Sequence, residues 1–280
     1  MSAEEIPLLS WSSGRWGFAA PEPGPISALT VLTQNTWFSA AHRARRLRGL
    51  LDALERSDAD VIALQEVLPD LRDRLLEADW VREQAVLAEG VGVAVSYGVM
   101  LISRVPVTRA WELPLPSAMG RSLLAMELTT EAGPLVVATA HFESTREMGA
   151  TRSAQLEAAF EALDAFDRAV LLGDFNFDPA DPEEAALDPR YVDLWPALRP
   201  GEPGYTEDTT RNAMRLAAKG REKHVRYDRV LARTPGWVPR AVSLVGTEPL
   251  APGVHLSDHF GVSATLVSSR ARDYRSVRRR

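Results

Sequence analysis

The alternation of hydrophobic and polar positions predicts two amphipathic helices and several short strands. Residues 42–57 carry four leucines at positions i, i+3, i+4 and i+7, which is typical of a helix with one buried face. Residues 153–167 carry a second stripe of this kind, formed by Leu156, Phe160, Leu163 and Phe166. Apolar runs of strand length lie at 29–34, 61–65, 93–102, 122–128, 135–140, 169–173, 226–232 and 259–267.

The order of these segments predicts the fold class and the extent of the domain. Strands and helices are mixed without strict βαβ alternation, which favours an α/β sandwich built of layers. Residues 1–27 contain four prolines and are interpreted as an irregular N-terminal extension. A single domain is expected over residues 28–268, followed by a basic C-terminal tail over residues 269–280.

Polar side chains of only four kinds follow or interrupt six of the apolar segments. They are Asn35, Glu66, His141, Asp174 with Asn176, Asp228, and Asp258 with His259. One polar residue at a strand boundary is more often solvated than catalytic, so a single case predicts little. The whole set predicts more, because strand ends that meet at one edge of packed sheets would form a single polar cleft.

These side chains are suited to a hard metal ion and a phosphate. Mg²⁺ prefers oxygen ligands and binds proteins through one or two carboxylates together with waters. Metal-assisted phosphoryl transfer also needs an oriented nucleophile and donors to the developing negative charge. Asp174 can orient or deprotonate a water, Asn176 can position that water or the phosphate, and the two histidines can donate to phosphate oxygens. Either Asp228 or Asp258 can orient His259 and raise its pKa.

Composition and charge limit the partners and the location. The chain has 280 residues, a net charge of −6 and no cysteine, so disulfides and thiolate metal sites are excluded. No apolar stretch reaches the roughly 18–20 residues of a membrane span, and the acidic start lacks a signal-peptide pattern. We therefore expect a soluble, cytoplasmic protein that does not act on membranes. Basic residues concentrate at 211–229 and in the tail, where they can contact phosphate or remain solvated.

Three short motifs resemble those of the endonuclease/exonuclease/phosphatase superfamily with the DNase I-like fold. They are "QEV" at 65–67, "GDFN" at 173–176 and "SDH" at 257–259, with Asn35 upstream and "YDRVL" at 227–231. The motifs appear in the order of the family, and the resemblance covers residues 29–267. It implies a four-layer α/β sandwich in which two packed mixed β-sheets are flanked by helices.

The same resemblance implies roles for the polar strand ends. The implied ligands of a Mg²⁺ or Mn²⁺ ion are Glu66, as the main one, and Asp258, with Asn35 close by. Asp174 would align the attacking water. Asp228 and His259 would form a supporting pair.

Four longer segments resemble, more narrowly, the 5′-tyrosyl-DNA phosphodiesterases. They are "PSAMGRSLL" at 116–124, "HFESTR" at 141–146, "VDLWPAL" at 192–198 and "GYTEDTTRN" at 204–212. This resemblance implies two groups of substrate-binding residues: Ser144, Thr145 and Arg146 at the phosphate, and Tyr97, Trp195 and Tyr227 along a channel for nucleotides. Two positions depart from the family pattern, since Glu207 replaces a tryptophan of the expected DNA wall and Asp178 replaces a basic residue.

Together these observations predict a Mg²⁺- or Mn²⁺-dependent phosphodiesterase with a function in DNA repair. We expect it to be a monomer that binds the 5′-end of single-stranded DNA. A nuclease, or a phosphatase that acts on a phospholipid or another phosphate ester, is the alternative within the superfamily. A non-catalytic binding module is disfavoured, because a degenerate copy should have lost some of the polar residues at the strand ends.

Overall fold

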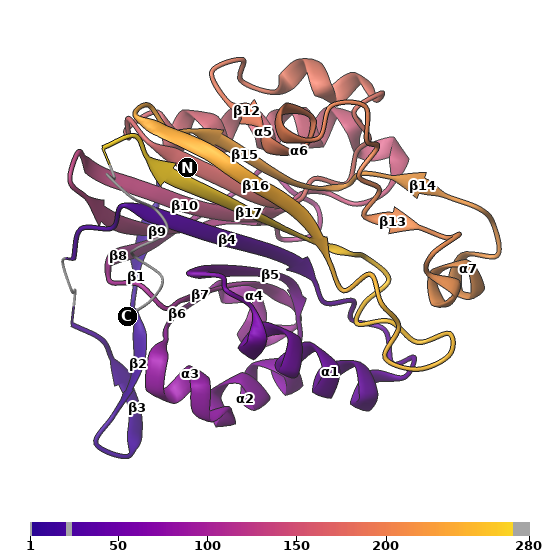
Figure 1. Ribbon diagram of the computed structural model, residues 1–280, viewed down its shortest axis with the longest axis horizontal. Helices are drawn as coiled ribbons and strands as arrows, with labels where there is room; N and C mark the ends of the chain where they lie inside the picture. Colours follow the sequence, from indigo (N-terminus) through magenta and orange to yellow (C-terminus); the bar gives the residue numbers. More distant parts are fainter. Residues whose placement is uncertain (1, 21–23, 271–280) are drawn as a thin grey trace.

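Two mixed β-sheets pack face to face in the computed structural model, which describes residues 2–20 and 24–270 (Figure 1). The eight-stranded sheet has the order β16 (Trp237–Val245), β17 (Gly261–Ser268), β4 (Ala28–Asn35), β5 (Val61–Val67), β7 (Gly98–Ser103), β6 (Val86–Glu89), β2 (Leu9–Ser12) and β3 (Arg15–Phe18). The seven-stranded sheet has the order β1 (Glu4–Ile6), β8 (Val107–Pro114), β9 (Ser122–Thr130), β10 (Gly133–His141), β11 (Ala169–Asp174), β15 (Asp228–Arg233) and β12 (Val192–Asp193).

Helices cover the outer faces of both sheets, which gives four layers (Figure 1). On the eight-stranded sheet lie α1 (Arg43–Arg56), α2 (Pro69–Glu77), α3 (Asp79–Gln84) and α4 (Val91–Val95). On the other side of the molecule lie α5 (Gly149–Leu163), α6 (Leu194–Leu198) and the 3-10 turns η1 (Arg146–Met148) and η2 (Pro182–Ala186). A small unit projects at one end, where α7 (Ala213–Lys219) joins the paired strands β13 (Glu207–Asp208) and β14 (His224–Val225).

The two sheets share one core because neighbouring side chains on a strand point to opposite faces. In β5, Val61 and Ala63 face the core between the sheets, whereas Ile62 and Leu64 pack under α1 and α2. A strand buried on both faces reads as a continuous apolar run, which is how this segment appears in the sequence. The four-layer sandwich expected from the family resemblance is therefore confirmed.

Two parallel strand pairs bring the predicted polar residues to one edge of the sandwich. β4 runs parallel to β5, and Asn35 lies beside Gln65 in the register. β10 runs parallel to β11, and His141 lies beside Asp174. The antiparallel strand β15 begins at the same edge, because Asp228 pairs with Asp174. Carboxyl ends of parallel strands meet at one edge, so these polar side chains share one end of the molecule.

Residues 4–18 correct the expectation of an irregular N-terminal extension. β1 pairs with β8 at the edge of one sheet, and the β2–β3 hairpin pairs with β6 at the edge of the other. Pro7 and Pro25 lie outside these three strands. Residues 4–18 are therefore part of both sheets. The predicted basic tail at 271–280 lies outside the described residues.

Two further expectations are corrected locally. The run expected as one strand over 93–102 divides into the helix α4 and the strand β7. The second predicted helix ends at Leu163, and Phe166 instead stacks on Trp111, with ring centroids 6.2 Å apart. The strands β6, β8 and β16 were not predicted, because their polar and apolar positions alternate with interruptions.

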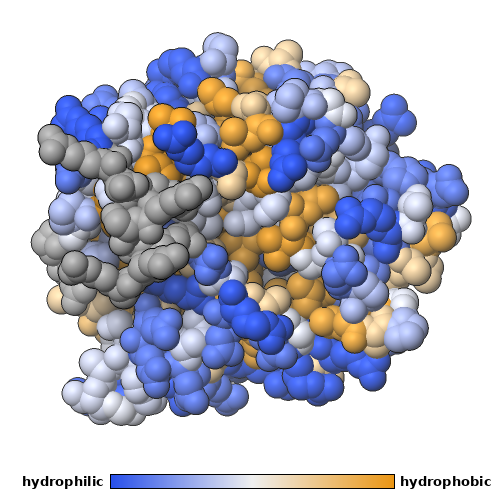
Figure 2. Space-filling model, in the orientation of Figure 1, coloured by the Kyte–Doolittle hydropathy of each residue, from blue (hydrophilic) through white to orange (hydrophobic). Residues whose placement is uncertain are grey.

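Among the described residues, no helix combines the length and the apolar character needed to cross a lipid bilayer. Figure 2 shows hydrophobic residues across the middle of one face of the molecule, bordered by hydrophilic ones.

The buried Arg46 holds the loop that connects β4 to α1. Its guanidinium donates to the carbonyl oxygens of Thr36, Trp37, Ser39 and Ala41 at 2.6–3.2 Å. Arg46→Met should lower the free energy of unfolding by about 2–4 kcal/mol, because these carbonyl groups would lose their donors. Urea denaturation measures the change. Arg48→Met, at an exposed position of the same helix, is the control and should shift stability by less than about 0.5 kcal/mol. Equal effects of the two substitutions would contradict this assignment.

Candidate active site

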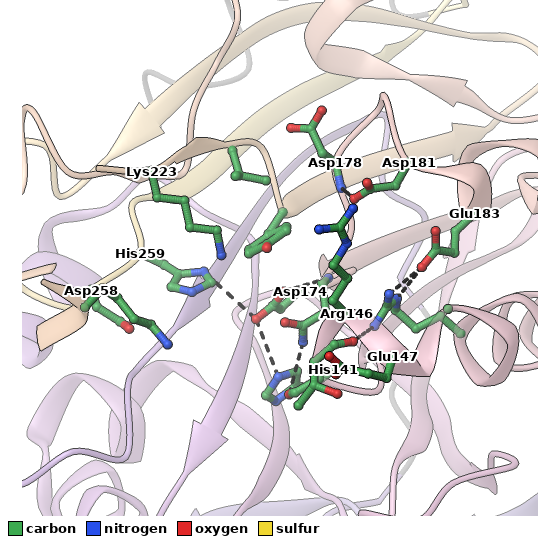
Figure 3. Close-up of a pocket in the computed structure, with 18 of the residues that line it drawn as sticks. His141, Arg146, Glu147, Asp174, Asp178, Asp181, Glu183, Lys223, Asp258 and His259 are labelled. Carbon is green, nitrogen blue, oxygen red and sulfur yellow. Dashed lines mark hydrogen bonds and ion pairs between the residues drawn. The ribbon is translucent and has the colours of Figure 1, made fainter. Parts of the chain in front are cut away.

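An open cleft of about 1190 Å³ lies at the edge where the polar strand ends meet. Nine of the side chains that line it were predicted at polar strand ends or in the "HFESTR" motif: Glu66, His141, Ser144, Thr145, Arg146, Asp174, Asn176, Asp258 and His259. Tyr227, predicted for the nucleotide channel, lines it as well. In Figure 3, His141 and His259 lie on two sides of Asp174. The cleft thus collects residues from both sheets around one carboxylate.

Glu66 enters the cleft from a β-bulge. The register between β5 and β7 shifts between Leu64 and Val67, and Glu66 has a φ of 58°. A bulge re-aims a side chain, which here turns Glu66 out of the sheet. Its carboxylate accepts from the backbone N–H of Phe38 at 2.8 Å and from Asn35 Nδ2 at 3.2 Å. Burial and the nearby charge of Asp258 raise the pKa of Glu66. A cation between these two carboxylates would relieve this repulsion.

Backbone strain is concentrated around the cleft. Six residues other than glycine have a positive φ in the described chain, and four of these line the cleft: Trp37, Glu66, Thr145 and Asn176. Such conformations cost about 1–3 kcal/mol each and persist only where the surrounding structure holds them. Their location therefore supports a functional role for this cleft.

Asp174 lies at the centre of the site and is almost completely buried. Its Oδ2 accepts from Asn35 Nδ2 at 2.9 Å and lies 3.5 Å from His141 Nε2, while its Oδ1 accepts from the N–H of Asn176 at 3.0 Å. Burial opposes ionisation, but the charge of His259 and these contacts lower the pKa of Asp174. Asp174 is therefore a carboxylate at neutral pH.

The glycine of "GDFN" allows β11 to approach β10 closely. Gly173 has a φ of 149°, and a Cβ at this position would lie 2.0 Å from the carbonyl oxygen of Ala140. Only glycine fits between the strands here. This close pairing sets Asp174 beside His141.

His259 and Asp228 form a buried ion pair beside Asp174. His259 Nδ1 donates to Asp228 Oδ2 at 2.8 Å. Burial disfavours protonation of His259, but Asp228 and the other nearby carboxylates raise its pKa well above the usual value. Burial also raises the pKa of Asp228, to about 6. The alternative left open by the sequence is thereby decided, because Asp228 rather than Asp258 orients the ring.

The donor set fits a hard divalent cation. Glu66, Asp174 and Asp258 bring three carboxylates to the cleft. Ligand atoms of Asp174, Asp228 and His259 also lie within 4.8 Å of one another, but His259 Nδ1 carries the hydrogen that it donates to Asp228 and so offers no lone pair to a cation. Asp258 Oδ2 pairs with Arg215 Nη1 at 2.8 Å. Mg²⁺ and Mn²⁺ both suit such oxygen-rich sites.

Of the three aromatic residues predicted for a nucleotide channel, one lines the cleft, one lies next to it and one lies in the core. Tyr227 lines the cleft, and its ring lies under Lys223 Nζ at 4.5 Å. Tyr97 is half-buried and does not line the cleft, but it contacts the cleft residue Phe38 at a centroid distance of 5.7 Å. The assignment of Trp195 is wrong. Its ring packs in the core between the sheets, and its Nε1 donates to the carbonyl of Glu202.

The expectation for Glu207 is also corrected. Glu207 is fully buried and does not form a wall of the cleft. Its carboxylate pairs with Arg215 Nε at 2.8 Å and with Lys223 Nζ at 3.1 Å. The substitution therefore adds no free negative charge to the cleft. Asp178, by contrast, does line it, beside Asp181 (Figure 3).

One residue of the site was missed by the sequence analysis. Arg121 is buried behind His141, with its Nη1 3.0 Å from His141 Nδ1 and its Nη2 3.0 Å from Ser144 Oγ. Its position in "PSAMGRSLL", one of the segments used for the family resemblance, was the available signal.

Comparisons with known proteins show which proteins this chain is similar to in sequence and fold. A sequence profile of the Endonuclease/Exonuclease/phosphatase family matches residues 32–259. Tyrosyl-DNA phosphodiesterase 2 of Mus musculus is 29% identical over 266 residues, which cover 89% of this chain and 69% of the mouse protein. The Homo sapiens protein of the same name is 31% identical over 80% of this chain and 63% of its own length. The crystal structure of D. rerio TDP2 complexed with a single-strand DNA product superimposes with a TM-score of 0.78 at 26% identity, covering 87% of this chain and all of that chain.

Proposed function

We propose that this chain, which belongs to the endonuclease/exonuclease/phosphatase family, is a metal-dependent phosphodiesterase that hydrolyses the bond between a tyrosine and the 5′-phosphate of DNA. The observation that carries the proposal is the convergence of Asn35, Glu66, Asp174 and the His259–Asp228 ion pair on one strained edge of the sandwich. The matched relatives are named for this reaction, and one related structure contains a single-strand DNA product.

The side chains divide the chemistry among them. Asp174 is ionised and can accept a proton from the attacking water, while Asn35 holds its carboxylate in place. The protonated His259 and the neutral His141 can donate to the phosphate oxygens, where negative charge develops. A divalent cation at Glu66 and Asp258 would supply a charge clamp on the phosphate. We propose Mg²⁺, because the ligands are carboxylates, and Mn²⁺ should substitute.

Tyrosine is a suitable leaving group for this set of residues. The phenol has a pKa near 10, so its departure needs less help from a general acid than that of an alkyl alcohol. The attacking water oxygen forms a bond to phosphorus as the bond from phosphorus to the phenolic oxygen breaks. The products are a free tyrosine side chain and a 5′-phosphate.

Unpaired cations in the cleft support a nucleic-acid substrate. Arg146, Lys219 and Arg221 line the cleft, and within the described residues no side-chain hydrogen bond or ion pair engages the charged groups of these three. Such free cations can contact the phosphates of a bound strand, and Tyr227 can stack on a base. We place the 5′-end at Ser144 and Arg146, next to His141.

The substrate is tested by offering the protein competing phosphodiester bonds. Purified protein with Mg²⁺ should release tyrosine from 5′-tyrosyl single-stranded DNA faster than it cuts internal bonds of unmodified DNA or RNA. Measurement of both rates on one labelled oligonucleotide decides between the two activities. The KM of the protein for 5′-tyrosyl single-stranded DNA should rise with the salt concentration, because screening weakens its contacts with the phosphates. Faster cutting of internal bonds would show that the protein is a nuclease instead. Faster hydrolysis of a phosphoinositide, offered in a parallel assay, would show that it is a lipid phosphatase instead.

A further inference from the structure

We infer that Arg121 is a positioning residue that fixes the tautomer of His141, so that the ring presents its Nε2–H to the reacting phosphate. In this arrangement Nδ1 of His141 is the hydrogen-bond acceptor and Nε2 carries the hydrogen. The inference rests on the proposed function for its catalytic consequence, but the tautomer itself is a property of the protein without substrate.

The contact between the two side chains determines where the proton lies. The guanidinium of arginine has only donors, so Arg121 Nη1 must donate to His141 Nδ1 across their 3.0 Å separation. Nδ1 therefore carries the lone pair. In a neutral imidazole the other nitrogen then carries the hydrogen, which places an N–H at Nε2. This Nε2 faces the cleft and lies 3.5 Å from Asp174 Oδ2 (Figure 3).

The surroundings keep this ring neutral. Burial and the charge of Arg121 outweigh the attraction of Asp174 and lower the pKa of His141 to about 3. The two histidines of the site thus differ, since His259 pairs with the carboxylate of Asp228 and His141 pairs with a guanidinium. His141 can donate one hydrogen bond without adding a full positive charge next to the cation His259.

A network of hydrogen bonds that includes the buried Glu143 holds Arg121 in place. Its Nη2 donates to Ser144 Oγ at 3.0 Å, and its guanidinium lies 5.4 Å from the centre of the Tyr97 ring. Its backbone N–H donates to Ser117 Oγ at 3.0 Å. Ser117 in turn donates to the carboxylate of Glu143, which also accepts from the N–H of Ala118. The loop that carries Arg121 is thereby fastened to the segment that carries Ser144.

Loss of the guanidinium would free the ring to change its tautomer. With the proton on Nδ1, the lone pair of Nε2 would face the carboxylate of Asp174 and the phosphate oxygens. A donor in the transition state would then become an acceptor, and the rate would fall without a comparable change in substrate binding.

The test is a ¹⁵N NMR experiment on the imidazole side chains of the whole protein. The chain has five histidines, and the signals of His141 are identified by their loss in His141→Gln. We expect His141 of the unsubstituted protein to show a hydrogen on Nε2 and none on Nδ1. In Arg121→Met the Nδ1–H form should appear, whereas Arg121→Lys, which keeps a cationic donor, should retain the original form in most molecules.

Kinetics on 5′-tyrosyl DNA then measures the consequence for catalysis. Arg121→Met should lower kcat by about 10- to 100-fold with less than a threefold rise in KM, and Arg121→Lys should recover part of this loss. Arg109→Met, at a half-exposed arginine remote from the cleft, is the matched control and should change neither kcat nor the His141 signals.

Three results would overturn the inference. The first is a hydrogen on Nδ1 of His141 in the unsubstituted protein, and the second is an unchanged His141 tautomer in a folded Arg121→Met protein. The third is a changed tautomer with full kcat. The first two are read without substrate, so they remain decisive even if the proposed substrate is wrong. If Arg121→Met does not fold, the spectra of the unsubstituted protein and Arg121→Lys still decide the tautomer.

Discussion

Glu66→Gln is expected to lower kcat/KM in Mg²⁺ by about three decades while leaving the protein folded. A bound divalent cation supplies several kcal/mol of charge stabilisation to a phosphoryl transition state, and about 4 kcal/mol corresponds to three decades. Glu66 is the carboxylate that the β-bulge turns into the cleft, and the glutamine amide keeps its size but not its charge. Steady-state kinetics over a range of Mg²⁺ concentrations measures the loss.

The thermal stability of Glu66→Gln, measured with and without Mg²⁺, should show whether Glu66 binds a metal ion or only stabilises the fold. Burial and Asp258 raise the pKa of Glu66, so the ionised group is disfavoured in the folded protein without metal. In EDTA, Glu66→Gln should therefore be at least as stable as the unsubstituted protein. Added Mg²⁺ should raise the melting temperature of the unsubstituted protein and not that of the variant.

Glu161→Gln, at an exposed position of α5, is the matched control and should keep both the activity and the response to Mg²⁺. The metal site at Glu66 would be wrong if Glu66→Gln were fully active in Mg²⁺. The metal mechanism as a whole would be wrong if the unsubstituted protein kept its activity in EDTA.

His259→Ala is the second substitution with a large expected effect, a fall in kcat of about two to four decades. The ring is held by Asp228 at 2.8 Å, and neighbouring carboxylates favour its protonated form. A cation fixed at this place stabilises charge that develops on the phosphate, so its loss should affect kcat more than KM. Single-turnover and steady-state kinetics together separate the chemical step from product release.

Two further variants sharpen this test. Asp228→Asn should cause a smaller loss than His259→Ala, because the amide oxygen can still accept from Nδ1 but does not favour the imidazolium. His42→Asn is the control for the loss of a histidine, since His42 is exposed and asparagine tolerates its φ of 51°. An unchanged kcat in His259→Ala would remove His259 from the mechanism.

The polar edge of the sandwich was predictable from the chain because two local patterns coincide there. The runs before Asn35, Glu66, His141 and Asp174 are predominantly apolar, which is typical of strands buried on both faces. Each ends at a residue suited to a cation or a phosphate. The motif "GDFN" also contains the glycine that the close strand pairing requires, so one short segment encodes both the packing and the carboxylate.

The N-terminal strands could not be predicted in the same way. Glu4–Ile6 and Arg15–Phe18 lie at the edges of sheets and are mostly exposed, so they lack the apolar pattern of a buried strand. An edge strand is stabilised by backbone hydrogen bonds to its neighbour, and these depend on a partner such as β8 that lies far away in the sequence.

The sequence by itself determined the fold class, the order of the strand ends and the kinds of side chain they deliver, because hydrophobic periodicity and residue chemistry are local properties. Only the tertiary structure decided which partner each side chain has. It buried Trp195 in the core, paired Glu207 with Arg215 and Lys223, chose Asp228 as the partner of His259, and set Arg121 behind His141. The physical reason is that burial, hydrogen-bond roles and pKa values depend on neighbours in space, which long-range packing brings together.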